Sequence, residues 1–280
     1  MKRLLQIEYH KMMANRSSRV LIMAYFVLLS LIASIAAIKF DFGPIEFHLA
    51  EQGIFNFPYI WHFNTYIAAI FKLFLAVVIV SMMANEYSYK TLKQNLIDGL
   101  SKYELVKSKM LMIVALSLCS TFFVFLLSLV LGYGFSDYNE IRIVFSDLEY
   151  LVAYFVKLLG FFSFCLFLSI LVKRSAFALG FLAVWQMAEG IAFGLMKWKL
   201  SDYVPSLSAE QVYSFFPLNS MSTLIPEPFT RLSAVKNVMG QIGEPIGINH
   251  EVSLVNIIIV ILWTAIFLWG SYRILERLDL

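Results

Sequence analysis

Six long stretches of almost uninterrupted apolar residues limit what this chain can fold into. About 20 helical residues are needed to cross a bilayer core about 30 Å thick, and each stretch comes close to that length. The six predicted spans are residues 20–38, 65–84, 110–131, 150–172, 176–196 and 254–270. Their continuous apolarity excludes a β-barrel, in which apolar and polar residues alternate over about 10 positions.

Composition supports the same interpretation. Of the 280 residues, 60% are hydrophobic and only 15% are charged, whereas about 25% of a typical soluble domain is charged. A soluble fold of this size cannot bury so much apolar surface. We therefore predict an all-α polytopic membrane protein, with residues 1–280 forming a single transmembrane domain.

The distribution of Lys and Arg predicts the orientation of the spans. Fourteen of the 22 lie before the first span, between spans two and three, in the turn after span four, or in the tail, and six lie on the opposite side. Cytoplasmic segments carry the excess of these residues. Both termini are therefore expected to be cytoplasmic.

The segment before the first span is predicted to be an amphipathic interfacial helix. Leu5, Tyr9 and Met12 recur at helical spacing on one face, with basic residues at the polar positions. A solvated basic leader is the alternative interpretation.

Residues 85–109 are the most informative segment outside the spans. Leu92, Leu96 and Leu100 form a weak apolar stripe at helical spacing, and Asp98-Gly99 predicts a helix end after it. The spacing of Ser101 and Glu104 predicts a capping box that starts a new helix leading into span three. Such a short helix across the inner face has the shape of a lever held by a soluble partner, although an ordinary interfacial loop fits the periodicity equally well.

This segment resembles the connection between spans two and three in ABC transporter permeases of the type-two exporter superfamily. The matching residues, in chain order, are Glu86, Thr91-Leu92, Gly99-Leu100-Ser101-Lys102 and Lys109. Residues 94–99 are especially similar to permeases of Bacteroidetes-type bacteria, whereas Lys90 stands where the family usually has glycine. The order of six spans, with cytoplasmic termini, an amphipathic leader and a long outer segment before the last span, resembles the family along the whole chain.

The resemblance implies that the leader is a connecting helix and that residues 85–109 contain the coupling helix, which docks on an ATPase. The positions carried over are Glu86, Thr91, Leu92, Leu96, Leu100 and Lys102. We expect the Leu92/Leu96 face to be the one on which ATP-driven closure pushes.

The resemblance also implies the partners and the location. Two six-span protomers, identical or different, would form the path in a bacterial cytoplasmic (inner) membrane. Separately encoded nucleotide-binding subunits would bind ATP and Mg²⁺. This chain has no G-x-x-x-x-G-K-[ST] motif with which to hold ATP phosphates, and we expect it to be neither an enzyme nor a binder of nucleic acid.

The outer segment, residues 197–253, contains five of the seven prolines. The resemblance implies that part of it dips back into the membrane as short re-entrant helices, and Phe215-Phe216-Pro217-Leu218 suits such a dip. Backbone at that depth must be buried in protein or line water. A plain extracellular loop is the alternative.

Three ionisable residues, Lys72, Lys157 and Glu189, interrupt the spans. Each lies seven residues from the outer end of its span, which corresponds to about 10 Å at 1.5 Å per residue. We predict an intramembrane polar layer in which Glu189 pairs with one of the lysines and which gates or shapes the transport path. The alternative is that the lysines snorkel to the outer headgroups.

Two other functions compete with an ABC exporter. An ion-coupled secondary transporter would use Glu189 as a proton relay, but the sequence shows no inverted repeat or matched broken helices. A membrane scaffold of a secretion or motility assembly would carry no substrate across the bilayer.

Overall fold

The computed structural model describes residues 2–38, 40–42, 45–47, 53–203, 208–232, 235 and 250–278, so part of the predicted outer segment lies outside the described residues. The bounds of the helices and strands, in chain order, are α1 Lys2–Ala14, α2 Arg16–Ala37, β1 Phe40–Phe42, β2 Ile45–Phe47, α3 Tyr59–Ile70, α4 Lys72–Ser88, α5 Thr91–Ile97, α6 Lys102–Phe135, α7 Ile141–Val144, α8 Glu149–Val172, α9 Ser175–Tyr203, α10 Ala209–Tyr213, α11 Pro217–Thr223, the 3-10 helix η2 Phe229–Arg231, and α13 Leu254–Arg277.

The prediction of an all-α membrane protein is confirmed. Within the described ranges, six helical stretches are long and apolar enough to cross a membrane. They are α2, α3 with α4, α6, α7 with α8, α9 and α13. The helices generally extend beyond the apolar runs, because counting apolar residues stops at the first polar positions whereas the helix continues through them. The short hairpin of β1 and β2 is the only sheet in the part of the chain that the structure describes.

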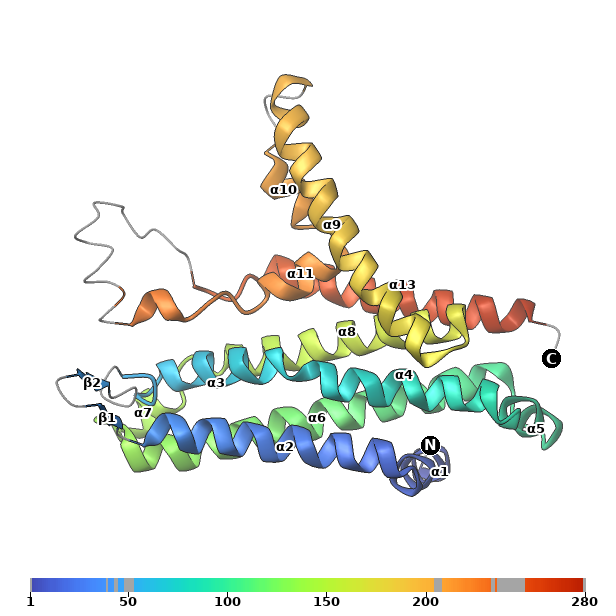
Figure 1. Cartoon of the computed structure of the whole chain (residues 1–280), viewed down its shortest axis with the longest axis horizontal. Helices are drawn as coiled ribbons and strands as arrows, with labels where there is room; N and C mark the ends of the chain where they lie inside the picture. Colours follow the sequence, from blue (N-terminus) through green and yellow to red (C-terminus); the bar gives the residue numbers. More distant parts are fainter. Residues whose placement is uncertain are drawn as a thin grey trace.

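Five of these stretches run side by side, and one does not (Figure 1). The stretches containing α2, α3 and α4, α6, α8, and α13 form the bundle, and α8 is the most buried of the spans. Helix α9 leaves the bundle at a steep angle and is the least buried span. The bundle has an "α5 end", where α1, α5 and the end of α13 lie, and a "hairpin end", where β1, β2 and α7 lie.

Close packing and a hydroxyl network hold the bundle together. A Cβ on Gly160 of α8 would lie 2.7 Å from Cγ1 of Val260 in α13, so only glycine permits this approach of the two helices. The buried hydroxyls of Tyr25, Ser120 and Tyr154 lie 2.5–2.9 Å from one another. Because each hydroxyl finds a partner, α2, α6 and α8 are joined without an unpaired polar group at this point.

The turns around α5 follow from local chemistry. The predicted capping box is present, with the Ser101 hydroxyl accepting from the Glu104 N–H and the Glu104 carboxylate accepting from the Ser101 N–H. Helix α5 ends at Ile97, and Gly99 adopts a φ of +92° in the predicted break. Lys90, just before α5, has a φ of +56°, which is the left-handed conformation that glycine adopts at no steric cost.

We predict that Lys90→Gly stabilises the protein. Removing the Cβ from a left-handed residue relieves steric strain, and we expect the free energy of unfolding to rise by about 0.5–1 kcal/mol. The matched control is Lys93→Gly, at an exposed helical position of α5, where glycine should cost about 1 kcal/mol. Thermal unfolding in detergent micelles measures both, and a lower midpoint for Lys90→Gly would contradict the prediction.

Candidate functional site

Helix α5 lies across one end of the bundle, connected by short turns to α4 and α6 (Figure 1). Leu92 is only 1% exposed, while Leu96 and Leu100 are partly buried and Leu100 packs against the core. The predicted stripe therefore faces the bundle. The Leu92 side chain is already covered by this chain, whereas Leu96 stays partly exposed, and a coupling role for the Leu92/Leu96 face stays a prediction.

A different set of residues faces outward. We call Tyr89, Lys90, Lys93, Gln94 and Ile97 the exposed α5 surface, because all five are solvent-exposed. Tyr89 and Ile97 are each 75% exposed, which leaves two large apolar side chains at the tip of the bundle among cationic and amide groups. Periodicity missed Ile97 because it lies beside Leu96 and falls off the stripe.

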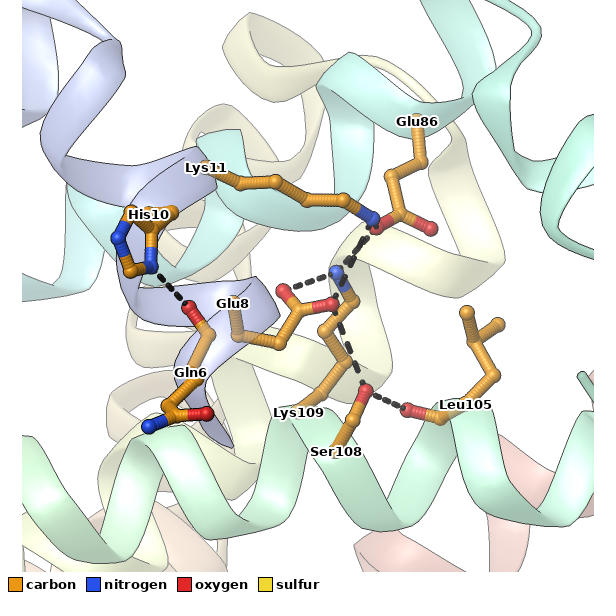
Figure 2. A network of polar contacts seen from close by, with 8 residues as sticks. All are labelled: Gln6, Glu8, His10, Lys11, Glu86, Leu105, Ser108 and Lys109. Carbon is orange, nitrogen blue, oxygen red and sulfur yellow. Dashed lines mark hydrogen bonds and ion pairs between the residues drawn. The ribbon is translucent and has the colours of Figure 1, made fainter. Parts of the chain in front are cut away.

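A buried ionic cluster joins residues of α1, α4 and α6 (Figure 2). The Lys109 ammonium of α6 lies 2.6 Å from a carboxylate oxygen of Glu8 in α1 and also contacts the carboxylate of Glu86 in α4. Lys11 of α1 adds a second ammonium 3.3 Å from Glu86. Ser108 donates to Glu8 at 3.5 Å. The cluster therefore ties three helices together at the α5 end.

The cluster balances two carboxylates against two ammonium groups. Glu8, Glu86 and Lys109 are each no more than 3% exposed. Charges buried this deeply are tolerated only when each is paired and hydrogen-bonded. Glu86, which the resemblance assigned to coupling, is thus held inside the protein and joins α4 to α1 and α6.

The leader helix contributes one residue that sequence reasoning missed. Helix α1 is present as predicted, but Tyr9 is 49% exposed, whereas Glu8 and Met12 are buried. Leu5, Glu8 and Met12 lie at i, i+3 and i+7, so they share one helix face. This spacing would have indicated that Glu8 faces the bundle. Only apolar residues were considered for that face, so the acidic Glu8 was missed.

Two further predicted coupling residues have identifiable neighbours. The Lys102 ammonium donates to the backbone carbonyls of Glu276 at 3.0 Å and Leu278 at 2.7 Å, and so holds the last turn of α13. A cation is stabilising there because helix carbonyls lack partners at a C-terminus. Thr91 is half-buried and lines a cavity of about 440 Å³ that Glu86 and Lys11 also line.

A family model described as ABC-2 family transporter protein matches residues 7–273. The chain belongs to this family. A comparison with curated proteins found no match. The match covers nearly the whole chain, from within α1 to within α13, so this ABC-2 family member is a transport permease, the membrane subunit of an ABC transporter. Neither a secondary transporter nor a scaffold is favoured by this family.

The intramembrane acid of this ABC-2 permease has unexpected partners. The carboxylate of Glu189 in α9 accepts the backbone N–H groups of Leu218 at 3.1 Å and Asn219 at 3.0 Å, and the Trp185 indole N–H at 2.8 Å. No salt bridge within the described residues joins Glu189 to Lys72 or Lys157, so the predicted pairing is wrong for this conformation. Equal depth along separate helices did not bring the side chains together, and the carboxylate instead caps the first turn of α11.

The two intramembrane lysines lie on a common cavity. Lys157 in α8 is 4% exposed and donates to the Ser222 carbonyl at 3.1 Å, and the Lys72 ammonium lies 4.4 Å from the centroid of the Phe161 ring. Both lysines line a cavity of about 1070 Å³. Lys157 therefore contacts α11 rather than snorkelling outward, and a role for these residues in gating stays a prediction.

The described part of the outer segment packs against the spans. Helix α11 starts with Pro217 at its first turn and contacts α8, α9 and α13. The Trp263 indole of α13 donates to the Phe215 carbonyl at 2.9 Å, and Trp263 lies nine residues into α13, or about 13 Å along its axis. The segment before α11 thus runs beside the interior of a spanning helix, as a re-entrant arrangement requires.

We predict that Lys109→Met is strongly destabilising. It leaves the carboxylates of Glu8 and Glu86 buried without their shared cation, which should lower the free energy of unfolding by about 3–5 kcal/mol. Lys11→Met is the matched control, because the Lys11 side chain is 37% exposed and its loss should cost at most about 1 kcal/mol.

Thermal unfolding in micelles measures this difference. Adding Glu8→Gln and Glu86→Gln to Lys109→Met should restore most of the lost stability, because it removes the uncompensated charge. Equal midpoints for Lys109→Met and Lys11→Met would show that the cluster does not carry the expected energy.

We also predict that Glu189→Ala loosens α11. Two backbone N–H groups lose their acceptor, each worth about 1–3 kcal/mol, so amide hydrogen exchange at Leu218 and Asn219 should accelerate at least about tenfold. Exchange of peptides covering residues 214–224, measured by mass spectrometry, tests this. The control is Glu210→Ala in exposed α10, which should leave the exchange unchanged, and protection that survives in Glu189→Ala would refute the capping role.

Proposed function

We propose that this chain is the membrane-spanning permease subunit of an ATP-driven exporter, in which separate nucleotide-binding subunits hydrolyse ATP. The observation that carries the proposal is helix α5. It projects an exposed surface from the end of the bundle while its Leu92 side is anchored inside. A short, firmly held helix of this kind suits a partner that pushes on the bundle.

The orientation of the bundle supports a cytoplasmic partner. Helices α1 and α5 and the end of α13 share the α5 end (Figure 1). The segments at this end carry the excess of Lys and Arg, which is typical of the cytoplasmic side. ATP is available on that side of a bacterial inner membrane, so the exposed α5 surface and the nucleotide-binding subunits would meet there.

The ionic cluster supplies a path for the push. A displacement of α5 acts first on the ends of α4 and α6, to which it is directly connected. Because Lys109 binds both Glu8 and Glu86, these ends move together with α1. We infer that ATP-driven closure shifts this three-helix unit and converts the spans between inward- and outward-facing arrangements.

A second permease protomer, identical or related, would complete the path. Helix α9 stands away from the bundle, and its exposed side chains are mostly apolar (Figure 1). Val184, Met187 and Ile191 are each at least 59% exposed. Such a face is suited to lipid or to another protomer.

We predict that Ile97→Asp weakens the contact with the nucleotide-binding subunits and lowers their ATPase rate while leaving the fold intact. The substitution places a charge in the contact with the ATPase, but Ile97 has little packing within this chain to lose. In proteoliposomes that contain the permease with its co-purified nucleotide-binding subunits, the ATPase rate should fall at least about tenfold, equivalent to 1.4 kcal/mol of lost interaction. The melting temperature of the permease alone should stay unchanged.

Ile141→Asp is the matched control. Ile141 is 74% exposed on α7 at the hairpin end, far from the proposed contact. ATPase activity should be retained in this variant. Equal activities of the two variants would refute docking on the exposed α5 surface, and purification of a permease that never affects an ATPase would refute the proposed function itself.

A further inference from the structure

A large cavity lies away from the coupling site. It is bordered by α3, α4, α8, the first half of α9, α11 and the start of α13, and its volume is about 1070 Å³. Ligand pockets range from about 300 to 1000 Å³, so there is room for a large molecule. Ile70, Leu73, Leu182 and Ile225 contribute to its mainly apolar wall.

Two lysine side chains line this mainly apolar cavity. Lys157 is buried and has the Ser222 carbonyl as its hydrogen-bond acceptor, and the Lys72 ammonium faces the ring of Phe161. Phe161 follows Lys157 by one helical turn, so both ammonium groups lie along the same stretch of α8. An ammonium in apolar surroundings is costly unless an anion balances it.

Among the described residues, no carboxylate forms a salt bridge with either lysine. Glu227 and Glu251 also line the cavity, but the Glu227 carboxylate accepts the Phe229 N–H at 2.9 Å. Glu189, a buried acid of α9, accepts hydrogen bonds from the backbone N–H groups of α11.

We propose that this cavity binds an amphiphile with an anionic headgroup, and that Lys72 and Lys157 hold the headgroup while the apolar wall receives the chain. The inference rests on the proposed function, because it takes this amphiphile to be the class of substrate that the permease moves. A carboxylate or phosphate gains charge-assisted hydrogen bonds from both ammonium groups. A neutral amphiphile gains only the apolar contacts, and a cationic one is repelled.

The binding experiment uses the full-length permease in neutral maltoside micelles with radiolabelled dodecyl phosphate as the probe. We expect saturable binding against which unlabelled laurate competes, and against which dodecanol and dodecylammonium compete at least tenfold more weakly. Inorganic phosphate alone should not compete, since it lacks the chain. Equal competition by dodecanol would overturn the role of the charge, and competition by inorganic phosphate would overturn the role of the apolar wall.

Two sources supply this chemistry, and a further arm separates them. Competition by phosphatidylglycerol, but not by phosphatidylcholine, supports a membrane lipid as the occupant. Competition by laurate without competition by phosphatidylglycerol supports a single-chain amphiphile taken up as free substrate.

Substitutions of the lysines test the headgroup contacts. Lys72→Gln and Lys157→Gln should each weaken binding of dodecyl phosphate about tenfold, because each removes one charged donor. Lys107→Gln is the matched control, since Lys107 also lies over an aromatic ring, that of Tyr103 at 5.6 Å, but at the α5 end. Affinity in the lysine variants equal to that of Lys107→Gln would overturn the proposal.

A second pair of variants leaves both lysines intact and so guards against misfolding of a lysine variant. Ala183 is exposed on α9 and lines the cavity, and Ala183→Trp should fill part of the space and weaken binding at least tenfold. Ala188→Trp places the same ring at an exposed position of α9 outside the cavity lining and should leave binding unchanged. Equal binding by the two tryptophan variants would overturn the assignment of the cavity.

Failure of this inference is distinguishable from failure of the proposed function. If dodecyl phosphate does not bind while Ile97→Asp still lowers the ATPase rate, only the substrate class is overturned. If dodecyl phosphate binds as expected but no ATPase responds to the permease, the cavity assignment stands and the ATP-driven function is overturned.

Discussion

Polar groups in apolar surroundings must find partners within the chain, and this requirement organises the whole structure. It makes the spans helical, because a helix satisfies its own backbone. It also explains where charged side chains are found: Glu189 accepts the first N–H groups of α11, Lys102 donates to the last carbonyls at α13, and Lys109 lies between two carboxylates. Lys157 follows the same rule, since its ammonium donates to the Ser222 carbonyl beside the large cavity.

The architecture was predictable because its signals are local. The length of each apolar run predicts a span, and Asp98-Gly99 followed by Ser101 and Glu104 specifies a helix end and a capped helix start within a few residues. The family was also recognisable from the sequence, since the segment between spans two and three carries the matching residues and the order of spans agrees along the whole chain.

The contacts of the candidate sites were less predictable, since they depend on residues distant in sequence. Glu8 and Lys109 are 101 positions apart, and neither local sequence indicates the other. Periodicity finds the stripe of Leu92 but not the side of α5 on which the bundle lies, so the outward position of Ile97 needed the structure. The estimated depth in the bilayer placed Glu189 near two lysines. It could not show that the carboxylate accepts hydrogen bonds from the N–H groups of α11 instead.

The tie between Lys102 and α13 has a geometric consequence. Helix α13 contains 24 residues and is therefore about 36 Å long. One end is fastened to the start of α6 by Lys102, while Asn256, near the other end, borders the large cavity. Helix α13 therefore connects the start of α6 directly to the large cavity. If α13 moves as a rigid body, a shift of a few ångströms at the start of α6 would displace the cavity lining at Asn256 by a similar distance.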